Sequence, residues 1–150
     1  MELVLWRHAE AEPGEEDLAR QLTAKGIKQA ARMGEWLDQT LPSTCRILVS
    51  PAARTVQTAD ALGRKYRIVP ELAPDRSVQE MLTAVNWPES RESVLVVGHQ
   101  PTLGLAASLL IAGQAQPWTI RKASICWIAQ KEQRTSNILR AVMGPELILK

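Results

Sequence analysis

The two histidines of this 150-residue chain each follow a short apolar run, and this repeated arrangement constrains the fold more than any other feature. Residues 3–6 lead into Arg7 and His8, and residues 94–97 lead to His99. Continuous apolar runs of this length are typical of strands that are buried on both faces of a parallel sheet. In such sheets, ligands bind at the carboxyl ends of the strands. We therefore expect both imidazoles to line one pocket.

Length and composition predict a single domain over residues 1–150, with 45% hydrophobic and 23% charged residues. The net charge of +2 argues against a nucleic-acid-binding protein, which would carry a basic stripe. Cys45 and Cys126 stand in no metal-ligand spacing, so we expect no metal and no cofactor. The first residues lack the pattern of a secretory signal, and no apolar stretch is long enough to span a bilayer. A cytoplasmic protein that does not bind membranes is the expectation.

Strand-like and helix-like apolar patterns alternate along the chain. Strands are expected at residues 3–6, 46–50, 66–69, 93–97, 123–129 and 137–142. Helices are expected from a Thr23 cap up to Pro42, from a Ser50 cap with Pro51 at the first position, at 78–85 and at 101–111. The first helix has an apolar stripe that begins at Ile27. This alternation predicts an α/β fold, a three-layer α/β/α sandwich with a mostly parallel sheet, whose last two strands are candidates for antiparallel pairing.

Polar side chains follow three of the expected strands. The first strand exit carries Arg7 and His8, the second carries Arg54 in S-P-A-A-R-T, and the third carries His99. Taken singly, each arginine fits a surface ion pair and each histidine fits a hydrogen-bonded core residue. Taken together on neighbouring strands, they form a cluster that would be costly without an anion. A phosphate dianion is the natural ligand, because guanidinium forks match its oxygens.

Five segments in this order resemble the histidine phosphatase superfamily, and more narrowly its small phosphohistidine phosphatases of the SixA type. They are L-W-R-H-A-E-A at 5–11, R-Q-L-T-A-K-G at 20–26, V-S-P-A-A-R-T-V-Q-T-A at 49–59, P-E-L-A-P at 70–74 and V-G-H-Q-P at 97–101. The resemblance spans most of the chain and implies a phosphoglycerate mutase-like fold. It also implies that His8 is the nucleophile and that Arg7, Arg54 and His99 bind the phosphoryl oxygens. Arg20 matches a further phosphate-pocket arginine.

The resemblance predicts a metal-independent phosphatase that forms a covalent phosphohistidine on His8. We add the backbone N–H of Gln100 as a candidate donor to the phosphoryl group. An imidazole leaving group, whose conjugate acid has a pKa of roughly 6.5, needs less assistance from an acid than an alkoxide does. The carboxylates that could protonate an alkoxide are Glu71, Asp75 and Glu80, and a solvated loop position is the ordinary interpretation of all three.

The predicted function is therefore the hydrolysis of phosphohistidine on proteins. The expected partner is a phosphohistidine-bearing component of a phosphorelay or phosphotransfer system. A phosphatase for small esters, such as sugar or nucleotide phosphates, is the alternative. A phosphate-binding module without turnover is a third possibility, although it would not require the nucleophile. The acidic segment 10–17 is expected to be a solvated loop or the rim of the pocket.

Overall fold

The computed structural model describes residues 1–131 and 136–148, and these form one six-stranded sheet in the order β3-β2-β4-β1-β5-β6. The strands are β1 (Glu2–Arg7), β2 (Arg46–Val49), β3 (Arg67–Ile68), β4 (Val94–Gly98), β5 (Ile125–Gln130) and β6 (Asn137–Met143). The first four pair in parallel, whereas β5 is antiparallel to both β1 and β6. The predicted α/β class, with a mostly parallel sheet and an antiparallel last pair, is confirmed.

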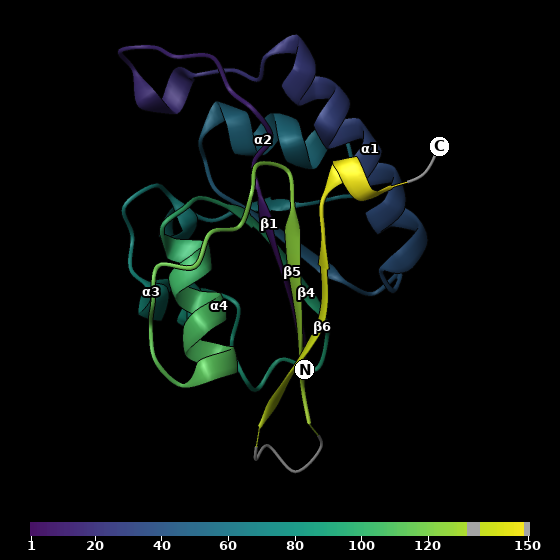
Figure 1. Ribbon diagram of the computed structural model, residues 1–150, viewed down its shortest axis with the longest axis vertical. Coiled ribbons are helices and arrows are strands. Elements are labelled where there is room, and N and C mark those ends of the chain that lie inside the picture. Colours follow the sequence, from purple (N-terminus) through teal and green to yellow (C-terminus); the bar gives the residue numbers. More distant parts are fainter. Residues whose placement is uncertain (132–135, 149–150) are drawn as a thin grey trace.

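Helices cover both faces of the sheet, which gives the three layers seen in Figure 1. They are α1 (Ala24–Thr40), α2 (Ala53–Asp60), α3 (Val78–Ala84) and α4 (Thr102–Ala112). Side chains of β1 alternate between two cores: Val4 and Trp6 pack under α1 and α2, while Leu3 and Leu5 pack under α3 and α4. Because both faces are covered, residues 3–6 of β1 and 94–97 of β4 are apolar at every position and not at alternate ones.

The start of α1 is fixed by its cap and by a close backbone approach. Oγ1 of Thr23 accepts a hydrogen bond from the N–H of Gly26 at 2.9 Å, as predicted for a cap. A Cβ on Gly26 would lie 2.0 Å from the carbonyl oxygen of Glu10, so only glycine fits between the helix and the chain that leaves β1. This contact turns the buried face toward Gly26 and Ala30. The prediction that Ile27 begins the buried stripe is wrong, because its side chain is 54% exposed.

The start of α2 differs from the sequence prediction. Ser50 is not its cap and Pro51 is not its first residue; the cap position is Ala52, which makes no side-chain cap bond. Ser50 lies directly after β2, and its Oγ is hydrogen-bonded to Nε2 of His99 at 2.7 Å. A residue type that is favoured at helix caps is therefore used at the strand exit instead.

The remaining elements are short. The strand predicted at 66–69 is only two residues long in β3, and α3 begins with a capping box formed by Ser77 and Glu80. Within the described residues, 3₁₀ helices lie at Asp17–Ala19, Pro70–Leu72 and Pro145–Leu147. No helix in the described part of the chain is long and apolar enough to cross a membrane.

Candidate active site

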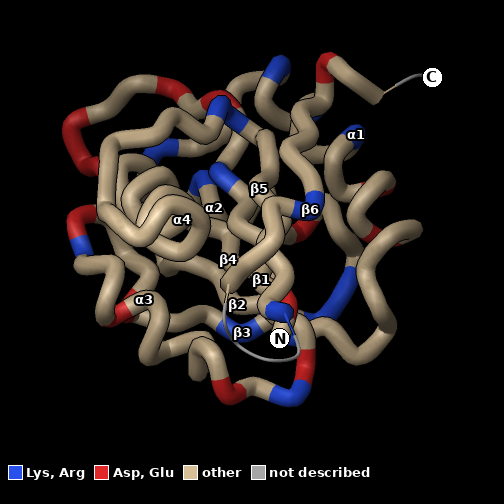
Figure 2. Tube along the Cα trace, turned by 60° about the horizontal axis from the view of Figure 1, so that its bottom comes forward, with Lys and Arg blue, Asp and Glu red and all other residues tan. Residues whose placement is uncertain are grey.

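A cavity of about 310 Å³ lies at the carboxyl ends of β1 and β4. It is lined by Arg7, His8, Ala11, Asp17, Arg20, Arg54, Pro74, Asp75, His99, Gln100 and Lys122. The structure thus brings together all six residues that the sequence analysis assigned to the site. Basic positions gather beside α2 in Figure 2. This is the location expected for a ligand of an open α/β sheet.

His8 is buried and is held by two backbone contacts. Its N–H donates to the carbonyl oxygen of Gly98 at 3.2 Å, which joins the exits of β1 and β4. Its Nδ1 donates to the carbonyl oxygen of Ala9 at 2.7 Å, and this bond leaves Nε2 as the unprotonated nitrogen. Burial, together with the positive charges of Arg54 and Arg7, lowers the pKa of His8 to about 4. His8 is therefore a neutral imidazole with a free Nε2 at neutral pH.

His99 faces His8 from the next strand exit, with the ring centroids 5.4 Å apart. Its Nε2 is hydrogen-bonded to Oγ of Ser50 at 2.7 Å. Burial lowers the pKa of His99 to about 3, and the charge of Arg54 acts in the same direction. Before a phosphoryl group arrives, His99 is neutral. A dianion beside it would favour its protonated form.

The two central arginines are fixed by carbonyl oxygens from distant segments. Nη1 of Arg7 donates to the carbonyl oxygen of Ile120 at 3.0 Å. Nη1 of Arg54 donates to the carbonyl oxygen of Asp17 at 2.7 Å, and its Nη2 donates to Oδ2 of Asp17 at 3.1 Å. The Arg54 side chain is only 5% exposed, so its guanidinium has little freedom to turn. Both guanidinium groups are held in place before any ligand binds.

Three buried side-chain nitrogens in the described residues have no hydrogen-bond partner: Nε of Arg7, Nε of Arg54 and Nδ1 of His99. Buried polar groups in folded proteins are almost always hydrogen-bonded, so an exception calls for a physical reason. All three belong to residues that line the same cavity. Their spare donor capacity fits a ligand rich in acceptor oxygens.

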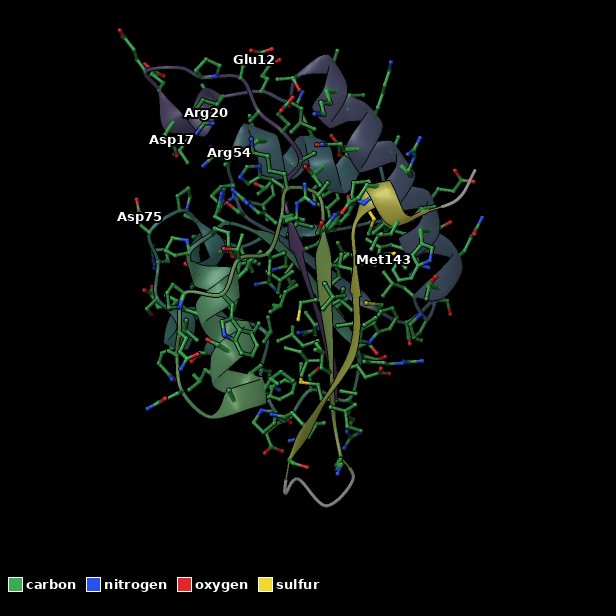
Figure 3. All side chains as sticks on the ribbon, in the orientation of Figure 1. Glu12, Asp17, Arg20, Arg54, Asp75 and Met143 are labelled. Atoms are coloured by element: carbon green, nitrogen blue, oxygen red, sulfur yellow. The ribbon has the colours of Figure 1, made fainter. Side chains whose placement is uncertain are left out.

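The rim of the cavity includes an ion-pair bridge that the sequence analysis did not identify. Oδ1 of Asp17 accepts from Nη1 of Arg20 at 3.1 Å, while Oδ2 accepts from Arg54. Figure 3 shows Asp17, Arg20 and Arg54 together at one side of the site. The hydrogen bond from Arg54 is the main cause that lowers the pKa of Asp17, so the carboxylate stays ionised. The spacing D-x-x-R within one short 3₁₀ turn is the signal that could have revealed this pair.

The three carboxylates considered as proton donors do not share one location. Asp75 lines the cavity, with a left-handed φ of 67°. Glu71 and Glu80 instead line a separate cavity of about 430 Å³ beside β2 and β3, and Glu71 also lines a small pocket together with His99. Glu80 is further occupied by hydrogen bonds from Arg76 and Ser77. Asp75 is therefore the one candidate of the three that lines the same cavity as His8.

The side chain of Gln100 has a structural task beside the cavity. Its Nε2 donates to the carbonyl oxygen of Trp118 at 2.9 Å, and its Oε1 accepts from the N–H of Gly104 at 2.8 Å. These bonds fix the segment that leads to Lys122, another cavity residue that the sequence analysis missed. In the described residues, no group of three or more His, Cys, Asp and Glu side chains is placed to hold a metal ion.

Comparisons with known proteins agree with this geometry. Residues 3–83 match the family model described as "Histidine phosphatase superfamily (branch 1)". The chain is 32% identical to a phosphohistidine phosphatase SixA homolog of Haemophilus influenzae, with 100% of both chains covered. It superposes on the histidine phosphatase SixA complexed with tungstate with a TM-score of 0.79, at 26% identity over 97% of each chain. The alpha-ribazole phosphatase of Shigella flexneri shares the fold, with a TM-score of 0.70 at 20% identity over 100% of each chain.

Proposed function

The chain belongs to the histidine phosphatase superfamily, and from that premise we propose that it removes the phosphoryl group from phosphohistidine on a partner protein. The observation that carries the proposal is the convergence on one cavity of His8, with its free Nε2, and of the hydrogen-bond donors Arg7, Arg54 and His99. A phosphoryl group offers three acceptor oxygens to such donors. Because the residues are already fixed by the protein, little reorganisation is needed when the ligand binds.

The first chemical step uses the free Nε2 of His8. This nitrogen forms a bond to phosphorus while the bond from phosphorus to the substrate imidazole breaks in line with it. The departing imidazole takes up a proton from solvent. Nδ1 of His8 keeps its proton and donates a hydrogen bond to the carbonyl oxygen of Ala9. This hydrogen bond stabilises the positive charge that develops on the ring. Arg7, Arg54 and His99 hold the equatorial oxygens.

The second step regenerates the enzyme. A water oxygen bonds to phosphorus as the bond to Nε2 of His8 breaks, and inorganic phosphate forms. The cationic side chains lining the cavity stabilise the charge on the transferring oxygens. Both steps are displacements at phosphorus in which positioning and electrostatics supply most of the catalysis.

Phosphohistidine is favoured as substrate because neither carboxylate that lines the cavity is a well-placed acid. Asp17 is held by Arg20 and Arg54, and Asp75 is exposed. An imidazole leaves without strong acid assistance, whereas an alkoxide requires a proton. The SixA homolog, aligned over the full chain, supports the same choice. The partner would be a phosphorelay or phosphotransfer component that carries the modified histidine.

Hydrolysis of small phosphate esters is the second candidate. Asp75 supports it, because this carboxylate lines the cavity that holds His8. A protonated Asp75 could transfer its proton to a departing alkoxide. The fold is also shared with a phosphatase named for alpha-ribazole.

The test compares phosphate release from a phosphohistidine protein with release from a panel of sugar and nucleotide phosphates. We expect fast release from phosphohistidine, poor release from esters, and no loss of phosphohistidine activity in Asp75→Asn. Glu80→Gln is the matched control, because it neutralises a carboxylate outside the cavity. Faster release from esters, with a loss in Asp75→Asn, would overturn the proposal and identify Asp75 as the acid.

A further inference from the structure

We propose that Lys122 is an additional phosphoryl-binding residue, presented to the cavity by a strained turn at residues 121–124. The proposal rests on the proposed function only in that the cavity binds a phosphoryl group. Lys122 lines the cavity with His8 and the arginines, although it lies far from them in sequence and in no recognisable motif.

The backbone next to Lys122 is strained. Ala123 has a φ of 61°, in the left-handed region that is disfavoured for a residue with a Cβ. Its N–H donates to the carbonyl oxygen of His8 at 3.1 Å, and its carbonyl oxygen accepts from Nε1 of Trp6 at 2.9 Å. Strain of this kind persists where the surrounding structure enforces it, and it is concentrated at functional sites. Here the contacts that enforce it come from Trp6 in β1 and from His8 directly after β1.

The rest of the turn is tied to the same strand. The N–H of Ser124 donates to the carbonyl oxygen of Arg121 at 3.0 Å and closes the turn. The N–H of Arg7 then donates to the carbonyl oxygen of Ser124 at 3.1 Å, and Nη1 of Arg7 donates to Ile120 at 3.0 Å. The turn is therefore built onto the segment that carries the nucleophile, and Lys122 keeps a fixed register with His8.

The chain that approaches the turn is also fixed. The carbonyl oxygen of Trp118 accepts from Nε2 of Gln100, and it lies so close to α4 that a Cβ on Gly104 would meet it at 1.7 Å. Lys122 thus lies only a few residues from an anchor on α4 and next to an anchor on β1. The long, flexible side chain can reach toward the cavity from this fixed backbone. The backbone is already ordered, so ligand binding costs it no further conformational entropy.

Neighbouring basic residues show that this placement is selective. Arg121 is paired with Glu146 at 3.6 Å, and it lines a different cleft from Lys122. Lys122 forms no ion pair with any residue that the structure describes. Two adjacent residues of the same charge therefore point to different surroundings. Lys122 is exposed, and its ammonium, which has no ion-pair partner among the described residues, is available to an anionic ligand in this cavity.

The charge of the cavity gives the chemical class of that ligand. Its lining contains four cationic side chains, those of Arg7, Arg20, Arg54 and Lys122, and two carboxylates, those of Asp17 and Asp75. With both histidines neutral, the formal excess is two positive charges. This excess matches a phosphoryl dianion, and without Lys122 only one charge would remain. We infer that Lys122 contacts a phosphoryl oxygen at the mouth of the cavity, as a point charge that needs no fixed fork geometry.

The test measures the affinity of the intact protein for inorganic phosphate by isothermal titration calorimetry, with orthovanadate inhibition as a second probe. We expect Lys122→Met to weaken phosphate binding by about five- to tenfold, typical of an accessible charge-assisted contact. Lys122→Arg should stay within about twofold of wild type. The matched control, Arg121→Met, removes the same charge from the adjacent residue and should change the affinity by less than about twofold. Thermal unfolding of each variant checks the fold.

Turnover separates this inference from the proposed function. Lys122→Met should lower kcat/KM for a phosphohistidine protein and for phosphoramidate by the same factor, because both carry the phosphoryl group. A loss confined to the protein substrate would overturn the inference and assign Lys122 to partner binding. Unchanged phosphate affinity in Lys122→Met would also overturn it. Weakened phosphate binding without any phosphohistidine turnover would retain the inference and reject the proposed substrate.

Discussion

The floor and the rim of the cavity are built in different ways. We call His8, Arg54 and His99 the floor, and Asp17, Arg20, Asp75 and Lys122 the rim. The floor residues are all buried and lie directly after strands or in the first turn of α2. The rim residues come from a loop, two short turns and a 3₁₀ helix, and they are half-buried or exposed. The floor holds the reacting and phosphate-binding side chains in fixed positions, whereas the rim sets the net charge at the mouth of the cavity.

This difference has an energetic consequence. Charges on the floor act in a medium of low effective dielectric, where one interaction changes rates or pKa values strongly. Charges on the rim are screened by water and salt, so each one has a modest effect. Substitutions on the floor should therefore change turnover by orders of magnitude, and substitutions on the rim should change affinity by small factors.

The largest effect is expected for His8→Ala on the floor. Removal of the nucleophile should lower kcat by at least about 10³-fold, since His8 supplies the free Nε2 that forms the covalent intermediate. Phosphate binding should persist, because Arg7, Arg54 and His99 remain. Single-turnover assays and calorimetry on the same preparation measure both quantities. Retained turnover with intact phosphate binding would remove His8 from the chemistry.

Arg54→Ala should have the next largest effect. It removes a buried cation and leaves the carboxylate of Asp17 at the cavity with Arg20 as its remaining ion-pair partner. We expect a loss of about 10²-fold in kcat/KM, together with weaker phosphate binding. Arg64→Ala is the control, since Arg64 is also an arginine paired with an aspartate, Asp38, but lies outside the cavity. An equal loss in both variants would trace the effect to stability.

The pKa of His8 provides a test of the floor that changes no residue. Burial lowers this pKa from 6.5 to about 4, so the nucleophile stays neutral between these values and activity declines only as the pH approaches 4. The unfolded state binds more protons than the folded state across this window. The free energy of unfolding therefore falls as the pH drops from about 6.5 toward 4. Imidazole resonances in NMR report the titration directly, because the chain has only two histidines. A titration of both near 6.5 would contradict the buried floor.

Ser50→Ala tests how the floor orients its second histidine. The substitution removes the hydrogen bond to Nε2 of His99 and lets the ring turn. We expect about a tenfold drop in kcat with a smaller change in phosphate affinity. Ser108→Ala is the comparison, because Ser108 is equally buried but bonds to carbonyl oxygens beyond the cavity. If kcat is unchanged in Ser50→Ala, the ring of His99 is oriented by packing alone.

The floor was predictable from the sequence and most of the rim was not. Strand exits are marked by apolar runs, so the positions of His8, Arg54 and His99 followed from local patterns and from a resemblance carried by short motifs. The order of the four parallel strands then placed these exits side by side. Ser50 was misinterpreted because the same hydroxyl suits a helix cap and a buried hydrogen bond, and only the tertiary contact with His99 decides between them.

Rim residues depend on contacts between segments that are distant in sequence. Lys122 reaches the cavity because Ala123 is forced into a left-handed conformation by bonds to His8 and Trp6, and no local pattern predicts that. Similarly, Ile27 is exposed because the close approach of Gly26 to Glu10 sets the rotation of α1. Docking geometry of this kind is a property of the assembled fold, so periodicity along one helix does not determine it.

The smallest effect is expected for Asp17→Asn on the rim, and it should have the opposite sign. Arg54 keeps its hydrogen bond to the carbonyl oxygen of Asp17, so the substitution mainly removes a negative charge that competes with phosphate. We expect phosphate affinity to rise by about threefold, with a gain that shrinks as salt is added. Glu16→Gln removes the same charge next to the cavity lining and should have little effect. Weaker phosphate binding in Asp17→Asn would instead mean that the carboxylate orients Arg20 and Arg54. In that case part of the rim would fix atoms as the floor does, and the contrast between the two regions would fail at this residue.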